Sequence, residues 1–131
     1  MSTSLRTTTP GAAVIQVLAI MRSEDVRHLL VVQDGALVGV LSNRDYRRII
    51  ERADAAGTIR NVGAVTVAEI MTPATTLIVR PPDTPLDELA RLMVTKKIGS
   101  VPIVEASGRP VGIVTQKDVL SALIGGDDGR P

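Results

Sequence analysis

The sequence predicts an α+β fold made of tandem β-α-β-β-α repeats that pack against each other with pseudo-two-fold symmetry. A seven-residue pattern occurs twice, at residues 39–45 and again 73 positions later at residues 112–118. Both copies read glycine, two aliphatic residues, a hydroxyl residue, an amide, a base and Asp. Upstream apolar residues also match at an offset of 72, as Met21 and Met93 do. Repeats of this kind decide the fold, and neither half carries enough apolar surface for comfortable stability alone.

The composition argues against several classes of function. The 131 residues suit one domain or two small ones packed together. The formal net charge is +1 and Tyr46 is the only aromatic residue, so neither a basic footprint nor base-stacking platforms for nucleic acid are present. With no Cys and a single His, we expect no disulfide, no thiol nucleophile and no metal site. No membrane insertion is expected, because the apolar run 11–21 is too short to span a bilayer, and a cytoplasmic location fits this composition.

Hydrophobic periodicity and turn signals predict the elements of the first repeat, which we place at residues 1–57. The predicted elements are a strand within 5–9, a helix at 11–22, strands at 28–33 and 37–41, and a helix from 43 to about 55. Asp34-Gly35 lies between the last two strands and is a strong hairpin signal. The final helix is expected to carry Tyr46, Ile49 and Ile50 as its apolar stripe.

The second repeat is placed at residues 73–125, after a linker and short lead-in helix at 58–72 and before a flexible tail at 126–131. The predicted elements are a helical turn at 67–71, strands at 75–79, 101–105 and 111–114, and helices at 85–97 and 116–124. Thr84 is the predicted N-cap of the first long helix, with Pro85 at its first position.

The repeated pattern places a hydroxyl residue where each final helix begins. A helix N-terminus presents unpaired N–H groups and a positive dipole end, which suits an anion. Ser42 and Thr115 could bond a phosphate oxygen there, and Arg44 and Lys117 could add positive charge. The carboxylates that follow, Asp45 and Asp118, suit a diol such as ribose, and phosphate beside ribose is a nucleotide.

The same residues have a purely structural interpretation. Ser-x-x-Asp and Thr-x-x-Asp are capping-box patterns, in which the hydroxyl and the acid satisfy the helix's own N–H groups. A cap of this kind contributes about 1 kcal/mol without any ligand. It does not account for the glycine upstream, or for the base before the acid, in both copies.

These motifs resemble a pair of cystathionine-β-synthase (CBS) domains. In the second half the resemblance lies in Ile70-Met71-Thr72-Pro73, then in residues 98–104 (IGSVPIV) and 112–118 (GIVTQKD). In the first half it runs from residues 27–32 (RHLLVV) to Asp45. The first half departs from the family pattern because it lacks an Ile-Met-Thr-like lead-in and carries Leu30 where such runs often have proline.

The resemblance implies adenosine-containing ligands, namely AMP, ADP, ATP or S-adenosylmethionine, as regulatory ligands rather than required cofactors, with AMP and ATP favoured. It implies that the hydroxyl of each motif meets phosphate and that the carboxylate meets ribose. Adenine would lie in a cleft walled by residues 76–78 and 100–102, with 5–8 as weaker counterparts. The candidate binding residues are Arg27, His28, Ser42, Arg44, Asp45, Thr76, Ser100, Pro102, Thr115, Lys117 and Asp118.

The favoured function is a regulatory sensor that binds an adenosine nucleotide in clefts between the two CBS motifs and acts on an effector protein. The family implies a homodimer, and helices 11–22 and 83–97 are the expected surfaces. A ligand-free dimerisation scaffold is the alternative that the capping-box interpretation favours. An enzyme is the third hypothesis. No Ser-His-Asp set, metal cluster or Walker loop appears, so no catalytic residue is assigned.

Overall fold

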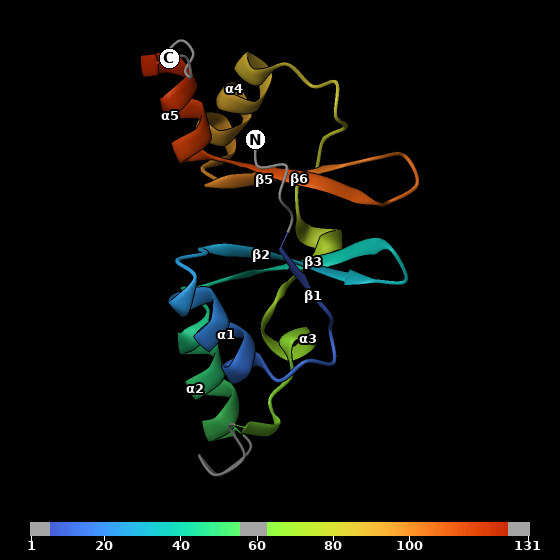
Figure 1. Cartoon of the computed structure of the whole chain (residues 1–131), viewed down its shortest axis with the longest axis vertical. Coiled ribbons are helices and arrows are strands. Elements are labelled where there is room, and N and C mark those ends of the chain that lie inside the picture. The colour runs from blue at the N-terminus through green and yellow to red at the C-terminus, as the bar shows by residue number, and fades with distance from the viewer. Residues whose placement is uncertain (1–5, 56–62, 126–131) are drawn as a thin grey trace. The chain divides into compact units, whose positions relative to one another are not determined.

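The computed structural model describes residues 6–55 and 63–125. The chain divides into two compact units, a first unit of residues Arg6–Leu77 and a second unit that starts at Ile78. The predicted tail, Leu5 and the first part of the predicted linker lie outside the described residues. Each unit combines helices with a small sheet (Figure 1), as the α+β prediction requires.

The first unit is built on a four-stranded sheet in the order β1-β2-β3-β4. Its elements are β1 (Thr7–Thr8), α1 (Val14–Ser23), β2 (His28–Gln33), β3 (Ala36–Ser42), α2 (Tyr46–Ala55), α3 (Val67–Ile70), β4 (Thr72–Pro73) and the 3₁₀ turn η2 (Ala74–Thr76). β1 runs parallel to β2, whereas β2 and β3 form an antiparallel hairpin. The helices lie on one face of the sheet (Figure 1), and Val14, Met21, Val31 and Leu41 are among the side chains buried between them.

The predicted hairpin turn at Asp34-Gly35 is confirmed. Asp34 has a φ of 53° and Gly35 a φ of 81°. Two successive left-handed residues make a type I′ turn, whose twist matches that of the flanking strands. The sequence therefore predicts where the chain turns from β2 into β3.

The second unit contains α4 (Leu86–Lys96), β5 (Ser100–Val104), β6 (Pro110–Thr115) and α5 (Gln116–Gly125). β5 and β6 are antiparallel, and both helices lie on the same face of this hairpin (Figure 1). Apolar side chains from all four elements form a separate core, namely Leu89, Met93, Val101, Ile103, Val114 and Val119. This core is the second-repeat counterpart of the one around α1.

The first helix of each unit ends in the same way. Asp25 and Lys97 both adopt the left-handed conformation, with φ of 55° and 56°. The next residue, Val26 or Ile98, then donates its N–H to the carbonyl of Met21 at 2.8 Å or of Met93 at 3.1 Å. This hydrogen bond is the signature of a Schellman motif. All three pairs of positions are 72 residues apart, as the repeat predicts.

The sheets repeat at the same offset. Both hairpins shift register at one place, between Val31 and Val32 in the first unit and between Ile103 and Val104 in the second. The parallel pairing of Thr8 with Val31 recurs as a single bridge between Arg80 and Ile103. The internal repeat is therefore a structural repeat, including its irregularities.

Some predicted boundaries are wrong. Residues 75–79 do not form a strand, because residues 74–76 form the η2 turn and only Arg80 is bridged to β5. Helix α2 begins at Tyr46 rather than Asn43, since residues 43–45 form a turn. Thr84 is not the N-cap of α4. Its hydroxyl donates to the Pro81 carbonyl at 2.8 Å instead, and Pro85 occupies the cap position.

Candidate functional site

The first motif forms a tight turn where β3 ends. The backbone N–H of Ser42 donates to Asp45 Oδ2 at 2.8 Å, and the N–H of Arg44 donates to Ser42 Oγ at 3.2 Å. The Asp45 N–H donates to the Ser42 carbonyl at 3.0 Å. Hydroxyl, base and carboxylate are thus held within one turn that leads into α2.

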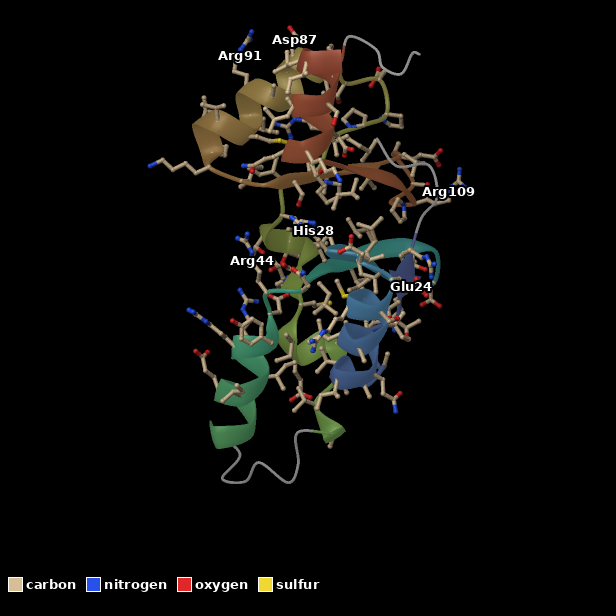
Figure 2. All side chains as sticks on the ribbon, turned by 60° about the vertical axis from the view of Figure 1, so that its left-hand side comes forward. Glu24, His28, Arg44, Asp87, Arg91 and Arg109 are labelled. Carbon is tan, nitrogen blue, oxygen red and sulfur yellow. The ribbon has the colours of Figure 1, made fainter. Side chains whose placement is uncertain are left out.

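Residues at the start of β2 join this turn. His28 is paired with Ser42 across the hairpin, and the N–H of Asn43 donates to the Arg27 carbonyl at 2.9 Å. Figure 2 shows His28 and Arg44 near each other. The structure therefore brings together five predicted site residues from two segments, and we call Arg27, His28, Ser42, Arg44 and Asp45 the first motif cluster.

The pKa of His28 reports the electrostatics of this cluster. Burial lowers the pKa of His28 from its usual value of 6.5, the charge of Arg44 lowers it, Asp45 raises it and Arg27 lowers it. The imidazole is therefore neutral at pH 7 in the folded protein. A bound anion would counter the two guanidinium charges and favour the protonated ring.

The second motif forms a full capping box at the start of α5. The Thr115 N–H donates to Asp118 Oδ2 at 2.8 Å, and the Thr115 hydroxyl donates to the same oxygen at 3.0 Å. In return, the Asp118 N–H donates to Thr115 Oγ1 at 3.3 Å. Ser100 is paired with Thr115 on the neighbouring strand, and Lys117 is exposed. We call Ser100, Thr115, Lys117 and Asp118 the second motif cluster.

Two predicted residues lie apart from these contacts. Pro102 is buried on β5, paired with Ile113, and its carbonyl accepts the Arg80 N–H at 3.1 Å. Thr76 is exposed on η2 in the first unit, where its hydroxyl donates to the Pro73 carbonyl at 2.9 Å. The prediction that Thr76 lines the wall of a cleft depends on a strand at residues 75–79, which does not form.

The structural interpretation of the motif is confirmed for the hydrogen bonds between the hydroxyl residue and the acid in each copy. Each carboxylate accepts hydrogen bonds at Oδ2 from its own hydroxyl residue. The upstream glycine of the first motif also has a structural reason, since a Cβ at Gly39 would lie 2.5 Å from Met71 Sδ and 2.8 Å from the Thr72 carbonyl. The base before each acid has no such explanation, because neither Arg44 nor Lys117 uses its side-chain nitrogens within the described chain.

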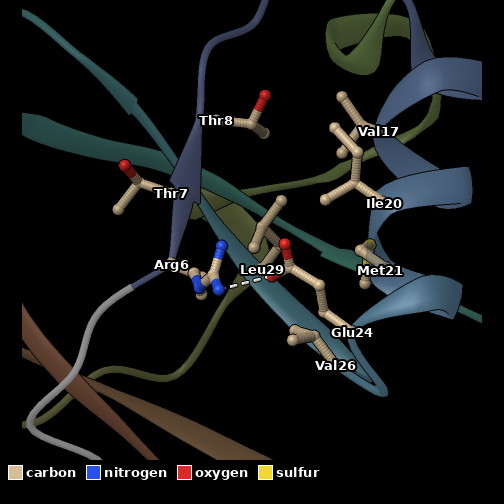
Figure 3. Close-up of a pocket in the computed structure, with 9 residues that line it drawn as sticks. All are labelled: Arg6, Thr7, Thr8, Val17, Ile20, Met21, Glu24, Val26 and Leu29. Carbon is tan, nitrogen blue, oxygen red and sulfur yellow. Dashed lines mark ion pairs between the residues drawn. The ribbon is translucent and has the colours of Figure 1, made fainter.

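A pocket that the sequence did not predict lies between β1 and α1 (Figure 3). It has a volume of about 90 Å³. The residues that line it are Arg6, Thr7, Thr8, Val17, Ile20, Met21, Glu24, Val26 and Leu29. Arg6 and Glu24 form an ion pair of 2.5 Å beside it. The pocket is well below the volume of a typical ligand site, about 300 to 1,000 Å³, so we do not assign the nucleotide to it. The parallel β1–β2 pairing that forms one side of the pocket joins distant residues, and no local sequence signal indicates it.

The described chain has neither a candidate metal centre nor a helix that could cross a membrane. Within residues 6–55 and 63–125, no group of three or more His, Cys, Asp or Glu side chains could hold a metal ion. In the same residues, no helix combines the length and apolarity that crossing a membrane requires.

Comparison with known proteins identifies the family. The model of the CBS domain matches residues 1–52 and 67–125. This chain belongs to the CBS-domain family. The fold prediction is confirmed with it, because solved structures of CBS-domain proteins match most of the chain.

Three similar proteins illustrate the range of the family. The chain is 33% identical over 117 residues to the uncharacterized protein MJ1225 of Methanocaldococcus jannaschii, covering 86% of this chain and 41% of MJ1225. The crystal structure of MJ1225 matches with a TM-score of 0.81 at 30% identity, over 94% of this chain and 45% of that one. The crystal structure of CBSX2 in complex with AMP matches with a TM-score of 0.76 at 30% identity, over 92% of this chain and 88% of that one.

The CBS domain pair of protein MJ0100, in complex with 5′-methylthioadenosine and S-adenosyl-L-methionine, matches with a TM-score of 0.74 and 31% identity, over 98% of this chain and 94% of that one. The present CBS-domain chain spans between 21% and 41% of the length of three curated relatives that it matches. Similar CBS pairs thus include proteins with adenosine-containing molecules bound.

Proposed function

We propose that this CBS-domain pair is a regulatory sensor that reversibly binds an adenosine-containing nucleotide. The observation that carries the proposal is the geometry of the two motif clusters. Each gathers a hydroxyl, a carboxylate and an exposed base into the turn that opens a helix. Two similar structures at 30% identity or more, CBSX2 and the MJ0100 pair, hold AMP, 5′-methylthioadenosine or S-adenosyl-L-methionine.

The chemistry of each residue gives it a role in this proposal. Ser42 and Thr115, with the N–H groups beside them, bind phosphate or the 5′ substituent. The carboxylates of Asp45 and Asp118 bind the ribose hydroxyls, for which Oδ1 accepts no hydrogen bond within the described chain. Arg44, Lys117 and Arg27 add charge, and the His28 ring adds a hydrogen-bond donor. Ser100, which is paired with Thr115, contacts the base in the second unit.

The cap and the ligand site are compatible. The hydrogen bonds at Oδ2 fix the orientation of each carboxylate before a ligand arrives, which lowers the entropy cost of binding. A capping box therefore preorganises the group that would hold ribose. In this proposal the chain regulates a partner protein and performs no reaction of its own.

A dimerising scaffold with empty sites is the second candidate. Apolar side chains are exposed on the contacting helices α4 and α5, with Val94 at 77%, Leu123 at 73% and Ile124 at 84% exposure. Large exposed apolar surfaces mark interaction sites. We propose that these helices contribute to a homodimer whether or not a nucleotide is bound.

Calorimetric titration with AMP and ATP tests the sensor proposal. The wild-type chain should bind at least one of them. The double variant Asp45→Asn and Asp118→Asn keeps an oxygen for each cap but loses the charge that holds ribose, so we expect binding to weaken at least tenfold. The variant Asp87→Asn, on the exposed face of α4, is the control and should bind as wild type. Wild-type affinity in the double variant would contradict the assignment.

A further inference from the structure

The two motif clusters share one backbone frame but not the same side chains. The N–H of Asn43 donates to the Arg27 carbonyl at 2.9 Å, and the N–H of Gln116 donates to the Gly99 carbonyl at 3.1 Å. His28 is paired with Ser42 as Ser100 is paired with Thr115. The positions of Arg27 and His28 are therefore occupied by glycine and serine in the second unit.

This replacement changes the charge of the cluster. In the first unit, Arg27 and Arg44 are close enough to lower the pKa of His28 by their charge. The first motif cluster thus holds two guanidinium groups and an imidazole, which belongs to the residue paired with Ser42. In the second unit, Lys117 is the only base among the equivalent positions. Because the hydrogen bond and the cross-strand pairing at the strand start are shared, the side-chain charge at these positions distinguishes the two clusters.

The lysines at the end of α4 do not occupy the positions equivalent to Arg27 and His28. Lys96 and Lys97 occupy the positions of Glu24 and Asp25 in the first unit. Glu24 is ion-paired with Arg6 at the pocket beside α1, rather than with the first motif cluster (Figure 3). By this equivalence, Lys96 and Lys97 belong to the end of α4 and not to the start of β5.

We propose that the two clusters have different ligand classes. The first motif cluster takes adenosine ligands with several phosphates, and the second takes adenosine ligands with little or no negative charge, such as a thioether nucleoside. Guanidinium groups bind phosphate through charge-assisted, often bidentate hydrogen bonds. In the first unit each added phosphate gains from the charges of Arg27 and Arg44 and from a hydrogen bond that the His28 ring can donate. In the second unit the equivalent positions offer only Lys117. The inference rests on the proposed function, because it divides the ligand class between the same two sites.

Exchanging the two strand-start residues between the units tests this inference. The first swap, Arg27→Gly with His28→Ser, is studied with Asp118→Ala, which leaves only the first site. The second swap, Gly99→Arg with Ser100→His, is studied with Asp45→Ala, which leaves only the second. A Cβ at Gly99 would meet no atom within 4 Å, so the structure has room for the new side chain. The unswapped single-site proteins are the matched controls.

Calorimetry with ATP and 5′-methylthioadenosine provides the readout. We expect the first swap to weaken ATP binding about tenfold or more, and the second swap to strengthen it by a similar factor. The affinity for the uncharged 5′-methylthioadenosine should stay within about twofold in both proteins, since it has no phosphate. In the unswapped proteins, ATP binding at the first site should also weaken more steeply with added salt than ATP binding at the second site.

Two results would overturn the inference and are distinct from failure of the proposed function. One is an equal loss of ATP and 5′-methylthioadenosine affinity in the first swap, which would indicate a structural role for Arg27 and His28. The other is unchanged ATP affinity in both swapped proteins. If the unswapped proteins bind neither ligand, the proposed function itself fails.

Discussion

Gly39 and Gly99 differ in how closely neighbouring atoms approach them. At Gly39 an added Cβ would lie 2.5 Å from Met71 Sδ and 2.8 Å from the Thr72 carbonyl, whereas at Gly99 it would meet nothing within 4 Å. We expect Gly39→Ala to lower the free energy of unfolding by about 1–3 kcal/mol, because β4 must move away from β3. Gly99→Ala should leave the free energy of unfolding unchanged or raise it slightly. Urea denaturation measures both, and equal effects would contradict this account of Gly39.

His28 should make the stability of the protein depend on pH. Its pKa is lowered from 6.5 in the folded chain, mainly by burial. The unfolded chain therefore binds the proton more tightly, so stability is lost as the pH falls below about 6.5 and is recovered above it. We expect the free energy of unfolding to drop between pH 7.5 and 5.5, and to drop less in His28→Gln. Identical pH profiles for the two proteins would show that His28 has no such role.

At the residue scale, the sequence predicted the contacts of the motif well because they are local. Ser42 and Asp45, or Thr115 and Asp118, are three positions apart, and their hydrogen bonds follow from the turn itself. The proximity of Arg27 and His28 to Arg44 follows from the hairpin register, which depends on the type I′ turn and on the register shift between Val31 and Val32. The packing of Met71 on Gly39 was missed, since it depends on a strand from beyond α3.

At the element scale, the prediction was wrong where tertiary hydrogen bonds decide. Residues 75–79 have the composition of a strand, but only the next residue, Arg80, is hydrogen-bonded to β5. Its N–H donates to the Pro102 carbonyl at 3.1 Å, and its carbonyl accepts the Val104 N–H at 2.9 Å. The start of α2 was also placed three residues early. Of the predicted apolar stripe of α2, Ile49 is buried whereas Tyr46 and Ile50 are exposed. Helical spacing thus indicates a shared face without showing what covers it.

The two helix starts provide a prediction at this scale. Thr115 Oγ1 takes part in two hydrogen bonds with Asp118 directly at the first turn of α5, whereas Ser42 Oγ accepts one from Arg44, ahead of α2. We expect Thr115→Ala to lower the free energy of unfolding by about 1 kcal/mol, and Ser42→Ala to lower it by less. Thr115→Ser keeps the hydroxyl and is the control. If Thr115→Ser destabilises as much as Thr115→Ala, the cap is not the cause.

At the scale of the whole molecule, the exposed apolar residues of α4 and α5 predict self-association. We expect a homodimer in sedimentation equilibrium, and a monomer when Val94→Asp and Leu123→Asp place charges on these helices. Gln33→Asp adds a charge at the exposed end of β2 in the first unit and should remain dimeric. A wild-type monomer at all concentrations, or a charged variant that still dimerises, would contradict the proposed surface.

Nucleotide binding is the central claim, and thermal unfolding with and without millimolar AMP, ADP, ATP and S-adenosylmethionine tests it most directly. A ligand at about 100 times its dissociation constant adds roughly 2.7 kcal/mol to stability, or several degrees in Tm. We predict such a shift for at least one of them, and its loss when Asp45→Ala and Asp118→Ala are combined, each protein being compared with its own ligand-free Tm. If no ligand moves the midpoint of the wild-type chain, the repeated motif is a pair of helix caps, and the chain is a dimerising scaffold.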